Sequence, residues 1–240
     1  IRHCFELFVK KGSNIICLDP TFGMYGVYSK IFRAKVTEIN FDKKLNLNFS
    51  KILKSINKKT SFVIFANPNS PTGTIIEPNK VLKIINKARQ NNCFVIIDEA
   101  YFGFYKTSFI KYINKYKNLI ILRTFSKSFG LAGLRAGFLA TNKKLCKEIF
   151  KTKPMYEMTT LTSIFVEEII KNKKLENIYI KNTKLSKKIF INYLKNKNIN
   201  FIDTKANFVH VEIIKNRSKF FKALKMSQIL INNNKIIKGL

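Results

Sequence analysis

The sequence predicts an α/β protein in which helices cover both faces of a parallel sheet. Two observations predict this class. Short β-branched runs alternate with longer segments whose apolar residues recur at intervals of three and four, as strands alternate with amphipathic helices. In addition, 46% of the 240 residues are hydrophobic, which is enough for a large core in one domain or one and a half.

The expected strands and helices follow one another along the chain. Strands are predicted at Asn14–Leu18, Lys35–Ile39, Ser61–Ala66, Cys93–Ile97, Leu119–Arg123 and Leu134–Ala140. Helices are predicted at Arg2–Val9, Phe22–Phe32, Glu77–Asn91 and Lys106–Lys117. Both ends look incomplete, because the chain opens inside a helical segment and stops just after an expected turn, at Lys238 and the two residues that follow it.

The character of the sequence changes near Leu145. Helical segments rich in Lys and Asn follow, among them a long helix from Leu175 to about Asn196, and then a strand at Asn207–Glu212. We therefore expect a large domain over residues 1–174 and part of a smaller α+β domain over residues 175–240.

Composition limits the possible chemistry. The formal net charge is +31, but the basic residues are mostly evenly spread lysines, which favours a solvated basic surface over a nucleic-acid or membrane site. Four scattered cysteines and two histidines indicate neither a disulfide framework, a metal site nor a Ser-His-Asp triad. No apolar run approaches the roughly 18 to 20 residues that cross a bilayer. We expect a cytoplasmic protein without a metal, and with neither nucleic acid nor membrane as a partner.

Two apolar strands lead directly into polar side chains. The strand Cys93–Ile97 is followed by Asp98-Glu99-Ala100-Tyr101, which places acids at the carboxyl end of a buried strand, where open α/β sheets bind ligands. Asp98 alone could equally be a helix cap. The strand Leu119–Arg123 leads into a segment containing Lys127, and a lysine in such a mostly buried setting can become a nucleophile toward carbonyls.

Hydroxyls, glycines and an arginine surround this lysine. Thr124 and Ser126 precede it, and Arg135 follows in a glycine-rich stretch, so these groups together predict a phosphate-binding cradle. A rigid turn, Asn67–Gly73, follows the strand Ser61–Ala66 and holds its polar groups at the same sheet edge. An ordinary loop remains the alternative for that turn.

In this order and spacing, the motifs resemble the class I/II aminotransferases of pyridoxal-5′-phosphate (PLP) fold type I. The resemblance rests on Asn67–Gly73, Asp98–Tyr101 and Thr124–Phe138, and it covers almost the whole chain. The segment Asp19–Tyr25 and the glycine-rich stretch around Arg135 are most similar to the histidinol-phosphate aminotransferases. The resemblance implies a mostly parallel sheet in an αβα sandwich, PLP as cofactor, and a homodimer whose subunits share the active site.

The resemblance also implies a role for each motif residue. Lys127 would anchor PLP covalently and move the proton at the substrate α-carbon, Asp98 would pair with the pyridine nitrogen, and Tyr101 would hydrogen-bond the ring oxygen. The members expected to bind the rest of the cofactor are Thr124, Ser126 and Arg135 for the phosphate and Phe22 for the pyridine face.

Three departures from the family pattern matter. Ser70 stands where the family usually has Asn, so either its hydroxyl or the side chain of Asn69 would contact the ring oxygen. Glu157 lies in Lys153–Thr159, where an acid suits a substrate phosphate poorly. The family's N-terminal glycine-rich turn and C-terminal carboxylate-binding arginine are not found in this sequence.

The sequence therefore predicts an aminotransferase that moves an amino group between an amino acid or amino phosphate and a 2-oxo acid. A PLP-dependent decarboxylase of the threonine-phosphate type is an alternative with nearly the same motifs. A non-catalytic basic fragment is a second alternative, from a different functional class, and steeply salt-dependent DNA binding without cofactor uptake would support it.

Overall fold

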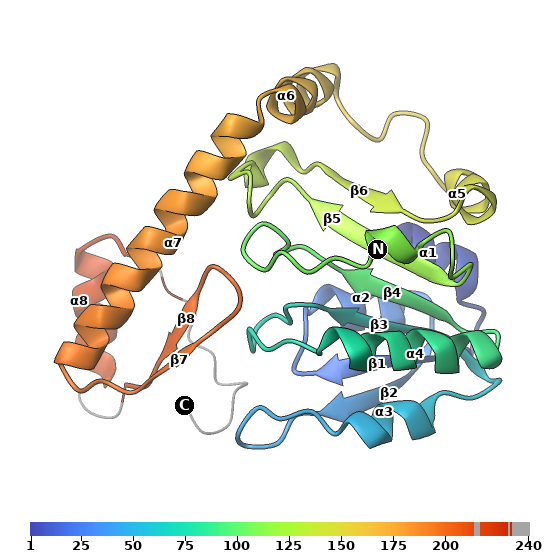
Figure 1. The fold of residues 1–240 in the computed structure, drawn as a ribbon, viewed down its shortest axis with the longest axis horizontal. Helices are drawn as coiled ribbons and strands as arrows, with labels where there is room; N and C mark the ends of the chain where they lie inside the picture. Colours follow the sequence, from blue (N-terminus) through green and yellow to red (C-terminus); the bar gives the residue numbers. More distant parts are fainter. Residues whose placement is uncertain (214–216, 230, 232–240) are drawn as a thin grey trace.

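The protein, described by a computed structural model over residues 1–213, 217–229 and 231, is built around one six-stranded sheet (Figure 1). Its strands lie in the order β2-β1-β3-β4-β5-β6. They are β1 (Asn14–Asp19), β2 (Lys35–Asn40), β3 (Thr60–Ala66), β4 (Phe94–Asp98), β5 (Leu119–Thr124) and β6 (Gly137–Ala140). All neighbours pair in parallel except β5 and β6, which are antiparallel. The mostly parallel sheet predicted from the sequence is confirmed.

Helices cover both faces of this sheet, as predicted (Figure 1). One face carries α1 (Arg2–Phe8), α2 (Met24–Ile31) and α5 (Lys143–Phe150), and the other carries α3 (Phe49–Ser55) and α4 (Pro78–Gln90). Alternate residues of β3 point to opposite cores, with Phe62 and Ile64 on the first face and Val63 and Phe65 on the second. The central strands are therefore apolar on both sides.

The remaining elements form a second group that does not extend the sheet. They are α6 (Thr160–Lys171), α7 (Lys173–Asn196), the antiparallel pair β7 (Phe201–Asp203) and β8 (Val209–Val211), and α8 (Arg217–Met226). In Figure 1, α7 leads from α6 to the pair β7–β8 and to α8. The expected strand Asn207–Glu212 is shortened to β8, and the turn expected before Lys238 lies outside the described residues. The division between residues 174 and 175 would fall in the first turn of α7, and it stays a prediction.

The helix expected at Lys106–Lys117 is wrong. The structure has only a 3₁₀ turn there, Ile110–Tyr112. The backbone N–H of Phe109 and the hydroxyl of Ser108 both donate to the carboxylate of Glu99 (2.7 and 2.8 Å). A helix over this segment would need the Phe109 N–H for its own backbone ladder, so a tertiary contact overrides the helical pattern.

The strand expected at Leu134–Ala140 begins three residues late. Ala132–Leu134 is a 3₁₀ turn, and Arg135 follows in the left-handed conformation with φ of 52°. The carbonyl of Ala136 then accepts a hydrogen bond from the N–H of Phe125 (3.1 Å), which starts the pairing that β6 continues. This break turns the chain before it joins β5.

No helix in the described part of the chain is long and apolar enough to cross a membrane. Within the same residues, no group of three or more His, Cys, Asp or Glu side chains is arranged to hold a metal ion.

Candidate active site

The loops that carry the predicted site residues meet at one edge of the sheet. In the parallel register, Ala66 at the end of β3 lies beside Asp98 at the end of β4, and Asp98 lies beside Leu122 near the end of β5. The loops after these strands hold Asn69 and Ser70, then Tyr101, then Lys127, and this placement matches the edge at which α/β sheets bind ligands.

Asp98 is a buried carboxylate, with 8% of its surface exposed. Its Oδ2 accepts a hydrogen bond from the hydroxyl of Tyr25 and its Oδ1 accepts one from the N–H of Ala100, both at 3.0 Å. Burial raises the pKa of Asp98, and these two hydrogen bonds act in the opposite direction. Within the described chain no Lys, Arg or His forms an ion pair with this carboxylate, so its charge lacks a counter-ion.

Lys127 and Tyr101 lie against each other. The ammonium nitrogen of Lys127 is 5.4 Å from the centre of the Tyr101 ring, a cation–π contact. The Tyr101 ring is buried and meets the ring of Phe208 edge to face at 5.7 Å. Residues that the sequence analysis assigned to one site are thus adjacent in space.

Asn69 and Ser70 differ in the freedom of their side chains. The amide nitrogen of Asn69 donates to the carbonyl of Pro20 (3.0 Å) and to the hydroxyl of Thr72 (2.8 Å), and its oxygen accepts from the hydroxyl of Thr21 (2.9 Å). This side chain therefore fastens the turn to the segment after β1. The hydroxyl of Ser70 makes no such side-chain contact with the residues described here.

The expected phosphate cradle is only partly assembled. Thr124 Oγ1 accepts from the N–H of Ser126 (3.1 Å) and donates to the carbonyl of Ala136 (3.3 Å). Arg135 is exposed, and its Nη1 donates to the carbonyl of Ala132 (3.1 Å). Thr124 and Ser126 are therefore brought together, whereas the Arg135 guanidinium binds its own turn in this conformation.

Phe22 projects from the segment after β1, with 41% of its surface exposed. Its ring meets the ring of Tyr25 edge to face, with centroids 5.7 Å apart and an interplanar angle of 84°. Tyr25, in turn, binds Asp98, so Phe22 and Asp98 are connected through a tyrosine to which the sequence analysis gave no role.

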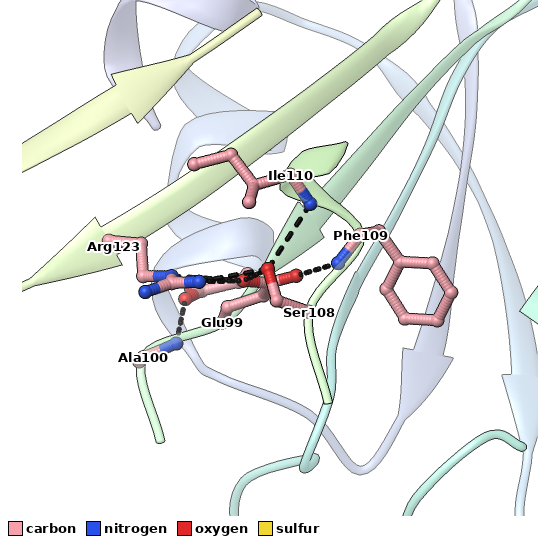
Figure 2. Close-up of polar contacts among 7 residues, drawn as sticks. Glu99, Ala100, Ser108, Phe109, Ile110 and Arg123 are labelled. Atoms are coloured by element: carbon pink, nitrogen blue, oxygen red, sulfur yellow. Dashed lines mark hydrogen bonds and ion pairs between the residues drawn. The ribbon is translucent and has the colours of Figure 1, made fainter. Parts of the chain in front are cut away.

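An ion pair that was also missed in the sequence analysis joins Glu99, directly after β4, to Arg123 in β5 (Figure 2). Nε of Arg123 donates to Oε2 of Glu99 at 2.9 Å, and Nη2 lies 2.8 Å from the same oxygen in an ion pair. Nη2 donates its hydrogen bond to the hydroxyl of Ser108 at 2.8 Å. Arg123 stacks over the ring of Phe102, with 3.4 Å from Cζ to the ring centroid. The pair borders a cavity of about 520 Å³ that extends to Thr124.

Glu157, the unexpected acid, is held by α1. Its Oε1 lies 2.7 Å from Nε2 of His3, and its Oε2 lies 4.0 Å from the ammonium of Lys153. The carboxylate is therefore engaged with its own neighbours in this structure.

The helix α7 and the turn before β8 are fastened onto the same loops. Ser128 Oγ donates to Glu176 Oε1 on α7 (3.0 Å), and the N–H of Lys205 donates to the carbonyl of Gly73 (3.0 Å). The second group of elements thus contacts both the lysine loop and the turn after β3.

Comparison with known proteins shows which family has this arrangement. The profile of the family described as aminotransferase class I and II matches residues 1–238. The chain belongs to this family. The predicted family is therefore confirmed.

Curated members of the family with the name histidinol-phosphate aminotransferase are similar in sequence. The protein from Clostridium novyi is 40% identical over 204 residues, which are 84% of this chain and 56% of that protein. The protein from Caldanaerobacter subterraneus is 35% identical over 236 residues, which are 97% of this chain and 66% of that protein. The chain thus spans between about half and two thirds of the length of these relatives.

Solved structures of family members share the fold. The histidinol-phosphate aminotransferase of Clostridium acetobutylicum superposes with a TM-score of 0.87 at 25% identity, covering 100% of this chain and 72% of that one. The histidinol-phosphate aminotransferase of Sinorhizobium meliloti, solved in complex with pyridoxal-5′-phosphate, gives a TM-score of 0.86 at 16% identity and covers 98% of this chain and 67% of that one. The predicted fold class is confirmed.

Proposed function

We propose that this chain is part of a PLP-dependent aminotransferase that moves an amino group between an amino donor, of the amino acid or histidinol-phosphate type, and a 2-oxo acid. The observation that carries the proposal is the buried Asp98 carboxylate without a counter-ion, at the same sheet edge as Lys127. The names of the relatives support the substrate class and a role in amino-acid biosynthesis.

The donor and acceptor set around Asp98 fits PLP. A protonated pyridine nitrogen would supply the cation that Asp98 lacks, since a buried charge is costly unless it is paired. The hydroxyls of Tyr101 and Ser70 suit the ring oxygen. Ser70 is a better candidate than Asn69, because both amide hydrogens of Asn69 already have partners. Phe22 offers a flat face for the ring.

The phosphate would be bound by Thr124, Ser126 and Arg135. Their hydroxyls and guanidinium are suitable donors, and Arg135 would exchange its hydrogen bond to the carbonyl of Ala132 for one to a phosphate oxygen. Charge-assisted hydrogen bonds to phosphate are stronger than the neutral carbonyl contact that Arg135 makes here.

When bound, PLP supplies an electron-withdrawing ring that stabilises negative charge at the substrate α-carbon. The chain itself contributes Asp98, which keeps the ring nitrogen protonated, and Lys127, which anchors the cofactor covalently and carries the proton to and from the α-carbon. Tyr101 packs against Lys127 and limits where its ammonium can lie.

Cofactor uptake tests the proposal directly. The chain is mixed with PLP, its visible absorbance is recorded, and the product is reduced with borohydride and mapped by mass spectrometry. We expect an absorbance band and an adduct on Lys127 that is lost in Lys127→Ala and kept in Lys171→Ala, a change at an exposed lysine. Adducts scattered over surface lysines, with no band, would reject the site.

Product analysis separates the transferase from the decarboxylase. Incubation with a histidinol-phosphate-type amino donor and a 2-oxo acid is expected to yield a new amino acid and a new oxo compound. Release of carbon dioxide from an amino-acid phosphate, with no amino transfer, would favour the decarboxylase instead.

We also propose that the full-length enzyme is a cytoplasmic homodimer with the large and small domains expected above. The helix α6 supports this assembly because four of its apolar side chains are about half exposed or more: Leu161, Ile164, Phe165 and Ile170. Sedimentation of the full-length protein measures the assembly directly, and a monomer at micromolar concentration would contradict it. Limited proteolysis near residue 174 tests the domain division.

A further inference from the structure

Tyr25 is a fully buried tyrosine whose hydroxyl is aimed at the site. It lies in the first turn of α2, it is 0% exposed, and its hydroxyl donates to Oδ2 of Asp98 at 3.0 Å. The hydroxyl of Ser29 donates to the carbonyl of Tyr25 (2.6 Å), which fixes this turn of the helix. The ring packs in the core between α1, α2 and the sheet, so its position is set by packing.

The same ring supports a second side chain of the site. Phe22 precedes Tyr25 by three residues, and the two rings meet edge to face at 5.7 Å. Aromatic pairs favour this geometry, which restricts the rotation of the more exposed Phe22. One buried residue therefore contacts both the carboxylate that we assign to the pyridine nitrogen and the aromatic ring that we assign to the pyridine face.

The hydrogen bond from Tyr25 also acts on the pKa of Asp98. Burial raises the pKa of Asp98, whereas the hydrogen bond from Tyr25 favours its ionised form. Burial, followed by the nearby charge of Asp98, raises the pKa of Tyr25 well above its ordinary value, so its hydroxyl stays a donor. The adjacent acid Glu99 opposes ionisation of Asp98, but Arg123 neutralises it.

We propose that Tyr25 is a positioning residue, which holds Oδ2 of Asp98 in place and supports Phe22, so that the two side chains are arranged to receive the pyridine ring. The part of this proposal that concerns the pyridine ring rests on the proposed function. The hydrogen bond from Tyr25 to Asp98 does not, because it is a contact within the protein. The contact and the cofactor binding can therefore be tested separately.

The cofactor-free chain gives the first test. The sequence has only four aspartates, so selective labelling with ¹³C at the side-chain carboxyl gives four signals, and Asp98→Asn identifies the one from Asp98. In Tyr25→Phe, the titration midpoint of Asp98 is expected to move to higher pH. Tyr116→Phe is the matched control, because Tyr116 is also buried but packs in the core on the opposite face of the sheet. Identical midpoints in the wild type and Tyr25→Phe would overturn the proposal.

The wild-type protein provides a measurement that does not depend on the folding of a variant. A buried hydroxyl proton that donates to a carboxylate exchanges slowly with solvent and gives a resolved signal that is shifted downfield in the proton spectrum. We expect such a signal from Tyr25, lost in Asp98→Asn and retained in Tyr116→Phe. A spectrum without this signal at low temperature, where exchange with solvent is slow, would count against the contact.

Cofactor binding gives the third test. We expect Tyr25→Phe to bind PLP about ten-fold more weakly, because a hydrogen bond to a charged group is lost, and to shift the pH dependence of the visible band, while Tyr116→Phe changes neither. If the wild type takes up no PLP, the proposed function fails while the carboxylate titration still tests Tyr25. If the wild type binds PLP and Tyr25→Phe binds and titrates identically, the positioning role is wrong.

Discussion

Glu99 and Arg123, at the ends of neighbouring strands, form a buried ion pair in which Nε of the guanidinium donates to one carboxylate oxygen and Nη2 lies 2.8 Å from the same oxygen. The other oxygen of Glu99 accepts the backbone N–H of Phe109 (2.7 Å). The pair therefore fastens the loop after β4 to β5 and to the segment that follows. Glu99 follows Asp98 directly in the sequence, but its ion pair with Arg123 stabilises the fold. The Asp98 carboxylate is thus left without a cation of its own.

Breaking this pair on one side is expected to destabilise the protein strongly. Arg123→Leu leaves Glu99 buried without its cation, so we expect the free energy of unfolding to fall by about 3 to 5 kcal/mol, measured by urea denaturation. The double variant Glu99→Gln with Arg123→Leu should recover part of this loss, because no charge is then left unpaired. Lys171→Ala breaks exposed ion pairs and serves as the control, with a much smaller expected change in the free energy of unfolding. An equal loss in Arg123→Leu and in the control would contradict the prediction.

Gly73 and Gly26 are expected to respond in opposite directions to substitution by alanine. Gly73 has a φ of 68°, and a Cβ there would overlap the side chain of Thr204. Gly73→Ala should therefore lower the free energy of unfolding by about 1 to 3 kcal/mol. Gly26 lies exposed in α2 with open space around it, so Gly26→Ala should stabilise by about 0.5 to 1 kcal/mol. Thermal unfolding measures both, and a stabilised Gly73→Ala would show that this contact is not tight.

The sheet and its functional edge could be predicted because their signals are local. The buried strands are short apolar runs, and polar side chains such as Asp98 follow them directly in the sequence. Short elements were missed. The seven-residue helix α3 has a recognisable start, since Asn48 caps it by accepting from the N–H of Lys51 (3.0 Å), and that cap could have been used to find it.

The remaining errors come from contacts between distant residues. The false helix at Lys106–Lys117 has a helical pattern, but Glu99 takes the N–H that the helix would need. The partners Glu99 and Arg123 are 24 residues apart, and no spacing in the sequence pairs them. The contact between Tyr25 and Asp98 spans 73 residues and follows only from the placement of α2 beside the sheet edge. Predicting these contacts requires the fold itself.

Buried thiols are expected to make the protein less stable in alkali. Burial raises the pKa of Cys4 to about 11 and the pKa values of Cys17 and Cys93 to about 12. Above about pH 9 the unfolded chain loses these protons while the folded chain keeps them, so the free energy of unfolding falls as the pH rises. Urea midpoints at pH 8, 9.5 and 10.5 measure the slope. Cys93→Ala should make the free energy of unfolding fall less steeply with pH, and Cys146→Ala, at an exposed thiol, should leave the slope unchanged. Equal slopes in both variants would show that the buried thiols do not cause the loss of stability.

Asp98→Asn is expected to separate stability from function. Burial raises the pKa of Asp98 in the folded state above the value of the unfolded chain, about 4. The contribution of this carboxyl to the free energy of unfolding is therefore complete below about pH 4, and it is lost as the pH rises through the pKa of the folded state. Asp98→Asn removes the buried group that has to ionise in the wild type. At pH 7 the free energy of unfolding of the variant, measured by urea titration, should therefore equal or exceed that of the wild type. Aminotransferase activity should nevertheless fall by about 100-fold or more, because the ring nitrogen of the cofactor loses its anionic partner. A variant that loses stability and activity together would assign Asp98 a structural role, and one that keeps full activity would remove it from the site.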